Sequence, residues 1–136
     1  LTEDLDNRER RVAKRLRRQR DLLADMEEPI VLGNGPTLLV GWGSSYGALE
    51  ELVQNHPTDL RLVHFSEVWP LRTERLLAEM ERARLVIAVE GNATAQLAQL
   101  IARETGRRIS RSVLRTDGRP LSAAYIEGKL HDLEVI

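Results

Sequence analysis

Residues 38–52 read Leu-Leu-Val-Gly-Trp-Gly-Ser-Ser-Tyr-Gly-Ala-Leu-Glu-Glu-Leu, which predicts a buried strand running through a glycine-rich turn into a helix. Gly41, Gly43 and Gly47 resemble a phosphate-binding turn, in which backbone N–H groups and a helix N-terminus face an anion, but their spacing has one residue more than the dinucleotide-binding pattern. This unit predicts the α/β class. It also raises the question of whether a ligand binds at the turn.

The same alternation continues along the chain. We expect strands at 37–41, 60–65, 85–90 and 111–114, and helices at 48–54, 73–84, 94–104 and 122–130. The segment 85–90 is almost continuously apolar, as in strands covered on both faces. Strands separated by helices of this length predict right-handed crossovers, and so a three-layer sandwich: a mostly parallel sheet with helices on both faces.

A very basic amphipathic helix precedes this pattern. Residues 8–20 carry eight Lys or Arg side chains against the single acid Glu9. An apolar face repeats at helical spacing, formed by Leu5, Val12, Leu16, Leu23 and Met26. Asp4, Asp6 or Asn7 could cap the helix start. Nucleic acid is a disfavoured partner because the stripe lacks stacking aromatics and the rest of the chain is acidic. We favour docking on a partner protein.

Two Pro and two Gly in residues 29–36 predict a linker between the helix and the α/β pattern. The expected organisation is therefore a basic connecting helix at 1–28, a linker at 29–36 and an α/β domain at 37–136.

Composition excludes several classes of protein. The length of 136 residues predicts one domain, and a formal net charge of −1 disfavours a generally nucleic-acid-binding surface. The chain has no cysteine, which rules out disulfides and thiolate ligands for zinc or iron–sulfur clusters. No apolar run approaches the roughly 20 residues of a membrane span, and no signal peptide is visible. We expect a cytoplasmic location and, since the chain begins at Leu1 rather than Met, a fragment of a longer polypeptide.

The glycine turn has two interpretations. Glu67 follows Gly47 by 20 residues, where an acid could reach a ribose, so a free-standing nucleotide-binding module remains open. We favour a tight strand-to-helix turn in which Gly43 adopts positive φ and Ser44 or Ser45 caps the helix. Trp42 and Tyr46 bring bulk to the turn, which suits packing against another domain.

Other polar residues point to the carboxyl end of the sheet. Glu90 ends the third predicted strand and Asn92 follows it, where both could bond backbone groups of a facing loop. The alternative is that Asn92 or Thr94 merely caps the next helix. Trp69, followed by Pro70, is a large apolar anchor typical of interfaces. The three histidines show no metal spacing, and His64 on the second strand is interpreted as a satisfied core or edge side chain.

Together these motifs resemble the alpha subunit of 2-oxoacid:ferredoxin oxidoreductases. The resemblance rests on Val-Gly-Trp-Gly-Ser-Ser-Tyr-Gly-Ala at 40–48, Val-Trp-Pro-Leu at 68–71, Val-Glu-Gly-Asn-Ala-Thr-Ala-Gln-Leu-Ala at 89–98 and Thr-Asp-Gly-Arg-Pro-Leu at 116–121. The basic first segment is also similar to the family's connecting helix, so the resemblance covers nearly the whole chain. One departure is Ala95, where the family usually has Gly.

The resemblance implies a transketolase-C-terminal-like domain that accompanies a thiamine-diphosphate catalytic domain. The whole complex would decarboxylate a 2-oxoacid oxidatively to acyl-CoA, passing electrons through iron–sulfur clusters to ferredoxin. Thiamine diphosphate, Mg²⁺ and the clusters would be bound elsewhere, and none by this chain, which would not be catalytic alone.

The implied partners are the N-terminal catalytic part of the subunit and a thiamine-binding beta subunit. Implied interdomain contacts are Trp42, Gly43, Ser44, Tyr46, Trp69, Pro70, Glu90 and Asn92. Transketolase, the beta chain of pyruvate dehydrogenase and deoxyxylulose-phosphate synthase share the fold and remain an alternative.

Overall fold

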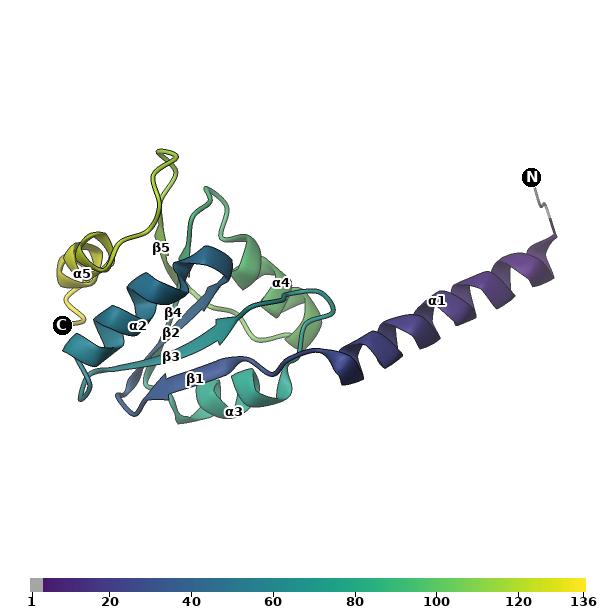
Figure 1. Cartoon of the computed structure of the whole chain (residues 1–136), viewed down its shortest axis with the longest axis horizontal. Helices are drawn as coiled ribbons and strands as arrows, with labels where there is room; N and C mark the ends of the chain where they lie inside the picture. Colours follow the sequence, from purple (N-terminus) through teal and green to yellow (C-terminus); the bar gives the residue numbers. More distant parts are fainter. Residues whose placement is uncertain (1–3) are drawn as a thin grey trace.

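A five-stranded sheet in the order β1-β3-β2-β4-β5 organises the computed structural model, which describes residues 4–136 (Figure 1). The strands are β1 (Ile30–Gly33), β2 (Thr37–Trp42), β3 (Leu60–Phe65), β4 (Leu85–Glu90) and β5 (Arg111–Leu114). Strands β2 to β5 run parallel, and β1 pairs antiparallel with β3. The predicted bounds of β3, β4 and β5 are confirmed.

Helices cover both faces of this sheet. One face packs against α2 (Tyr46–Asn55) and α5 (Ala123–Asp132), and the other against α3 (Glu74–Arg82) and α4 (Gln96–Thr105) (Figure 1). Adjacent residues of β2 divide between the two cores, with Leu39 in the first and Leu38 in the second, because side chains alternate across a strand. The predicted three-layer sandwich is confirmed.

The predicted linker at 29–36 is wrong, because residues 30–33 form the edge strand β1. Val31 and Leu32 pair with Val63 and Leu62 of β3. Proline and glycine mark the limits of this strand rather than preventing it. Gly35 serves the return turn, since a Cβ there would lie 2.1 Å from the backbone carbon of Asp59.

The basic helix α1 (Leu5–Asp25) projects from the domain as an arm (Figure 1). Its N-cap is Asp4, whose side chain accepts a hydrogen bond from the Asp6 N–H at 3.0 Å. Of the three predicted capping residues, Asp4 is therefore the one confirmed. None of its residues is buried, and Leu5, Val12 and Leu16 are all exposed. Within residues 4–136, no helix combines the length and apolar character needed to cross a bilayer.

Candidate functional site

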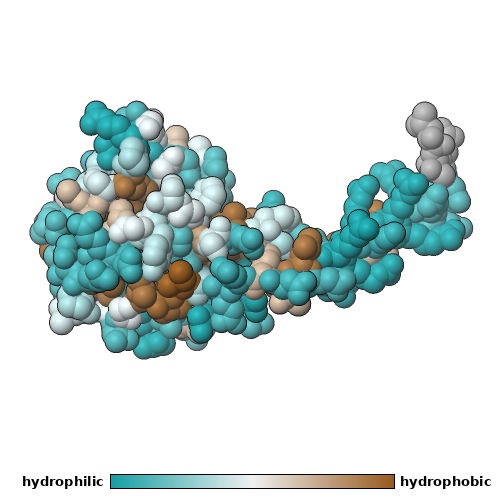
Figure 2. All heavy atoms as spheres, viewed as in Figure 1, coloured by the Kyte–Doolittle hydropathy of each residue, from teal (hydrophilic) through white to brown (hydrophobic). Residues whose placement is uncertain are grey.

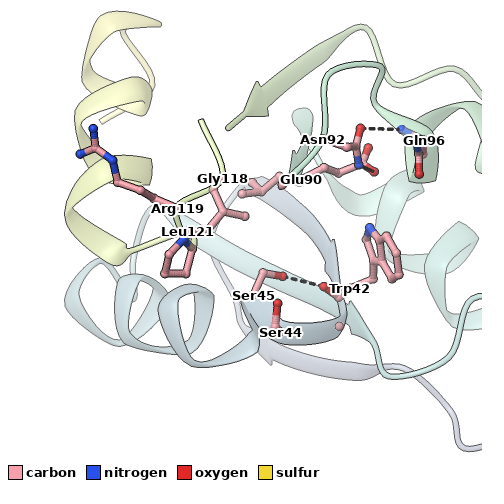
Figure 3. A pocket seen from close by; sticks show the side chains of 13 residues that line it. Trp42, Ser44, Ser45, Glu90, Asn92, Gln96, Gly118, Arg119 and Leu121 are labelled. Atoms are coloured by element: carbon pink, nitrogen blue, oxygen red, sulfur yellow. Dashed lines mark hydrogen bonds between the residues drawn. The ribbon is translucent and has the colours of Figure 1, made fainter. Parts of the chain in front are cut away.

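The connections from two neighbouring strands diverge at the carboxyl edge of the sheet. From β2 the chain passes into α2 on one face, and from β4 it passes into α4 on the opposite face. Such a switch point leaves a crevice where open α/β sheets bind ligands. A groove of about 520 Å³ opens there, lined by residues 42–45, 89–92 and 118–121 together with Gln96 (Figure 3).

The junction after β2 is built around two glycines with different roles. A Cβ on Gly41 would lie 2.4 Å from Leu49 Cδ1, so this position needs glycine for close packing. Gly43 has the predicted positive φ, +63°, and begins a short 3₁₀ turn. The predicted serine cap of α2 is wrong: the Ser45 hydroxyl donates to the Trp42 carbonyl at 2.9 Å instead.

His64 lies buried against this junction, with an exposed fraction of 3%. Its ring meets Tyr46 edge-on, with the centroids 5.1 Å apart. Neither ring nitrogen has a hydrogen-bond partner among residues 4–136, so the expectation of a satisfied histidine is wrong. Burial lowers the pKa of His64, and the backbone of Gly43 and Trp42 counteracts this effect in part.

The junction after β4 is internally satisfied. Glu90 is 1% exposed, and its carboxylate accepts hydrogen bonds from the backbone N–H groups of Leu97 at 2.7 Å and Ala98 at 3.3 Å. The Asn92 amide donates to Glu90 at 3.0 Å, while its oxygen accepts from Gln96 N–H at 3.2 Å. Both side chains therefore cap α4, and Glu90 supplies the anion that a helix N-terminus favours.

The segment that leads into α5 forms the third wall of the groove, and a serine side chain caps the start of that helix. The Ser122 side chain accepts a hydrogen bond from the Tyr125 N–H at 3.2 Å and so caps α5. Before it, residues 118–121 line the groove, and only the motif at 116–121 pointed to them in the sequence. The Arg115 guanidinium, hydrogen-bonded to Asp117 at 3.0 Å, lowers the pKa of Asp117, with a further contribution from the Arg119 N–H.

Five of the eight predicted contact residues come together in this groove: Trp42, Gly43, Ser44, Glu90 and Asn92. The other three lie outside its lining. Tyr46 bonds Glu50 at 3.4 Å, and its pKa is raised by burial and then by Glu50. Trp69 is 52% exposed, precedes Pro70, and lies under the Arg103 guanidinium at 5.4 Å. Glu67 does not line the groove either.

The groove is better equipped for recognition than for bond-making. Its buried carboxylate is occupied by helix N–H groups, and the Arg119 side chain is directed away from Glu90 and Asn92 (Figure 3). The open groups are the Trp42 indole, which is 36% exposed, and the exposed Ser44. Across residues 4–136, no three His, Asp or Glu side chains gather in a group that could hold a metal ion.

Relatives of the chain agree with the resemblance seen in its sequence. It is 29% identical over 96% of its length to 2-oxoacid:ferredoxin oxidoreductase 1, subunit alpha, of Sulfurisphaera tokodaii, and 29% identical to the alpha subunit from a Sulfolobus species. The chain spans 22% and 21% of these curated relatives. No protein-family model matches the sequence.

Solved structures extend the comparison to the fold. One is a 2-oxoglutarate:ferredoxin oxidoreductase from Magnetococcus marinus with 2-oxoglutarate, coenzyme A and succinyl-CoA bound. The match covers 96% of the present chain and 24% of the Magnetococcus marinus chain, with a TM-score of 0.83 and 20% sequence identity. The alpha chain of a probable 2-oxoacid ferredoxin oxidoreductase from Thermoplasma acidophilum matches 78% of the chain and 96% of its own, with a TM-score of 0.51 and 27% identity. The predicted fold and family resemblance are confirmed.

Proposed function

We propose that this chain is an accessory domain of the alpha subunit of a 2-oxoacid:ferredoxin oxidoreductase. The observation that carries the proposal is the 29% identity over 96% of the chain to alpha subunits of that enzyme. The complex would decarboxylate a 2-oxoacid oxidatively, form an acyl-CoA and reduce ferredoxin in the cytoplasm. Coenzyme A as acyl acceptor is supported by its presence in the Magnetococcus marinus relative.

In this proposal the redox chemistry takes place outside the chain. Thiamine diphosphate, Mg²⁺ and iron–sulfur clusters would be held by other parts of the complex, where thiamine stabilises the carbanion and the clusters carry single electrons. A chain without cysteine cannot ligate a cluster through thiolates. Its own residues would shape and assemble the surroundings of the active site.

The groove is the proposed contact with the catalytic part of the subunit or with the beta subunit. Trp42 offers an exposed indole of the kind enriched in interface centres, and Ser44 lies beside it. Glu90 would act through Asn92, which it holds in place by a hydrogen bond. Trp69 and Pro70, with Tyr46, would form a second contact outside the groove.

A substitution in the complex tests this contact. Ser44→Arg places a bulky charge at the groove, and we expect it to weaken subunit association about tenfold, measured by native mass spectrometry over a dilution series. Ferredoxin reduction should fall in parallel. Thr58→Arg is the matched control, because Thr58 is exposed in the turn before β3, at the amino edge of the sheet.

The outcomes separate the activity from the contact. Unchanged assembly together with unchanged ferredoxin reduction in Ser44→Arg would reject the groove as the contact but leave the activity of the complex standing. The activity itself is rejected if the wild-type complex fails to reduce ferredoxin with coenzyme A and each of pyruvate, 2-oxoglutarate, and branched and aromatic 2-oxoacids. Saturable NAD(P) binding that disappears in Gly43→Val would support a nucleotide-binding module instead.

A further inference from the structure

The arm α1 exposes several large apolar side chains to solvent. Its exposed fractions are 73% at Leu5, 47% at Val12 and 50% at Leu16. At 100° per residue, Leu5, Val12, Leu16 and Leu23 fall within roughly 40° of one another, which makes a single stripe along the helix. Figure 2 shows the arm extending clear of the domain, with apolar side chains among hydrophilic ones.

The arm is held firmly where it leaves the domain. The Arg72 guanidinium donates to the Met26 carbonyl at 2.6 Å, and Glu28 pairs with Arg72 at 3.6 Å and with Arg75 at 3.2 Å. Leu23, the innermost residue of the stripe, is already half-buried, next to Leu71. The stripe is therefore presented in a defined direction, which lowers the entropy lost on docking.

The excess of basic side chains on α1 indicates which kind of partner would cover the stripe. Residues 5–25 carry eight basic and four acidic side chains, whereas residues 26–136 carry twelve basic and fifteen acidic ones. Three arginines, Arg8, Arg15 and Arg20, lie within roughly 90° of the centre of the stripe, against the single acid Glu9. A second copy of α1 would bring two basic flanks together, which is unfavourable. RNA phosphates would pair with the Lys and Arg side chains of α1 but would leave its leucines exposed to solvent.

We propose that α1 is a docking arm for an acidic protein surface, in which a strip of apolar side chains flanked by Asp and Glu covers Leu5, Val12 and Leu16. The packed stripe supplies most of the affinity, because an amphipathic helix gains its stability mainly from burial of its apolar face. The flanking charges choose the partner and speed the encounter.

The test titrates the 136-residue chain with a designed helix of the length of α1 that carries Leu along one stripe and Glu on both sides. A probe with the same Leu residues but Lys flanks, and a short RNA duplex, are measured in parallel by fluorescence anisotropy. We expect the Glu probe to bind at least about tenfold more tightly than either, with an affinity that falls as salt rises.

A pair of charge reversals shows whether the stripe is the contact. Arg15→Glu flanks it, whereas Lys14→Glu lies about 180° away and changes the net charge equally. Arg15→Glu should weaken binding of the Glu probe about tenfold and Lys14→Glu less than about threefold. The proposal is overturned if both reversals act equally, if the Glu probe does not bind, if RNA binds as tightly, or if sedimentation shows that the chain pairs through α1 itself.

Discussion

The junctions that flank the groove end two adjacent parallel strands, yet one is closed and the other open. After β4, Glu90 and Asn92 take up the N–H groups at the start of α4. After β2, the start of α2 has no side-chain cap, and neither ring nitrogen of the neighbouring His64 has a hydrogen-bond partner in the described part of the chain. The closed junction gives the sheet edge a rigid wall. The open one presents the exposed Trp42 and Ser44 to the groove, while His64 stays buried behind them.

Removing the Glu90 carboxylate should have the largest effect on the free energy of unfolding. Glu90→Ala leaves buried N–H groups of α4 without an acceptor, and we expect a loss of about 3 kcal/mol in the free energy of unfolding. Glu90→Gln keeps one acceptor oxygen and should lose about half as much. Urea denaturation measures both, with the exposed Glu51→Ala as control. A loss for Glu90→Ala no larger than the control's would show that the cap is not structural.

The two turn glycines should separate packing from backbone strain. Gly41→Ala forces a methyl against Leu49 and should cost about 2 kcal/mol in the free energy of unfolding. Gly43→Ala has open space but a φ of +63°, so about 1 kcal/mol is expected. Gly47→Ala, in the first turn of α2 with open space around it, should stabilise slightly. Equal costs at Gly41 and Gly43 would contradict this division of roles.

The open junction should also introduce a pH dependence. Because burial lowers the pKa of His64 in the folded state, the unfolded chain binds more protons below its ordinary pKa of about 6.5. Stability is therefore complete above that pH. It falls as the pH drops from about 6.5 towards the folded pKa, by at most about 1.4 kcal/mol per pH unit.

His64→Leu isolates this contribution, since His56 and His131 stay in both proteins. Denaturation between pH 7.5 and 5, a range chosen around the ordinary histidine pKa of about 6.5, should give a flatter stability profile for the variant. Parallel profiles for the variant and the wild type would contradict the buried neutral state of His64.

The smallest effect concerns the entry to α4. Ala95 has a φ of +51° and a ψ of +55°, a left-handed conformation that costs an alanine about 1 kcal/mol. The Gly usual in the resembling family suits this position for its backbone conformation. Ala95→Gly should raise the free energy of unfolding by about 0.5 kcal/mol, because part of the gain is offset by the greater freedom of glycine in the unfolded chain. A lower thermal midpoint in Ala95→Gly would contradict the strain.

The sequence by itself determined the layers of this protein. The mostly apolar segment at 60–65, the nearly continuous apolar run at 85–90 and the helical spacing between them are local signals. They predicted strands and helices close to those observed. They also placed Glu90 and Asn92 at the end of a strand. The motif at 116–121 indicated the family resemblance, but it did not show that residues 118–121 line the groove.

Tertiary structure decided the strand order, the edge strand β1 and the site. Pairing β2 with β4 brings residues 42–45 beside 89–92, and the path to α5 adds 118–121. The carboxylate of Glu90 is used internally because α4 begins directly beside it. The strand order and the groove depend on which surfaces meet after long crossovers, and no local pattern encodes them. The Glu90 cap is shorter in range, since its partner Leu97 is seven residues away, but it forms only where the turn after β4 brings the start of α4 back to the carboxylate.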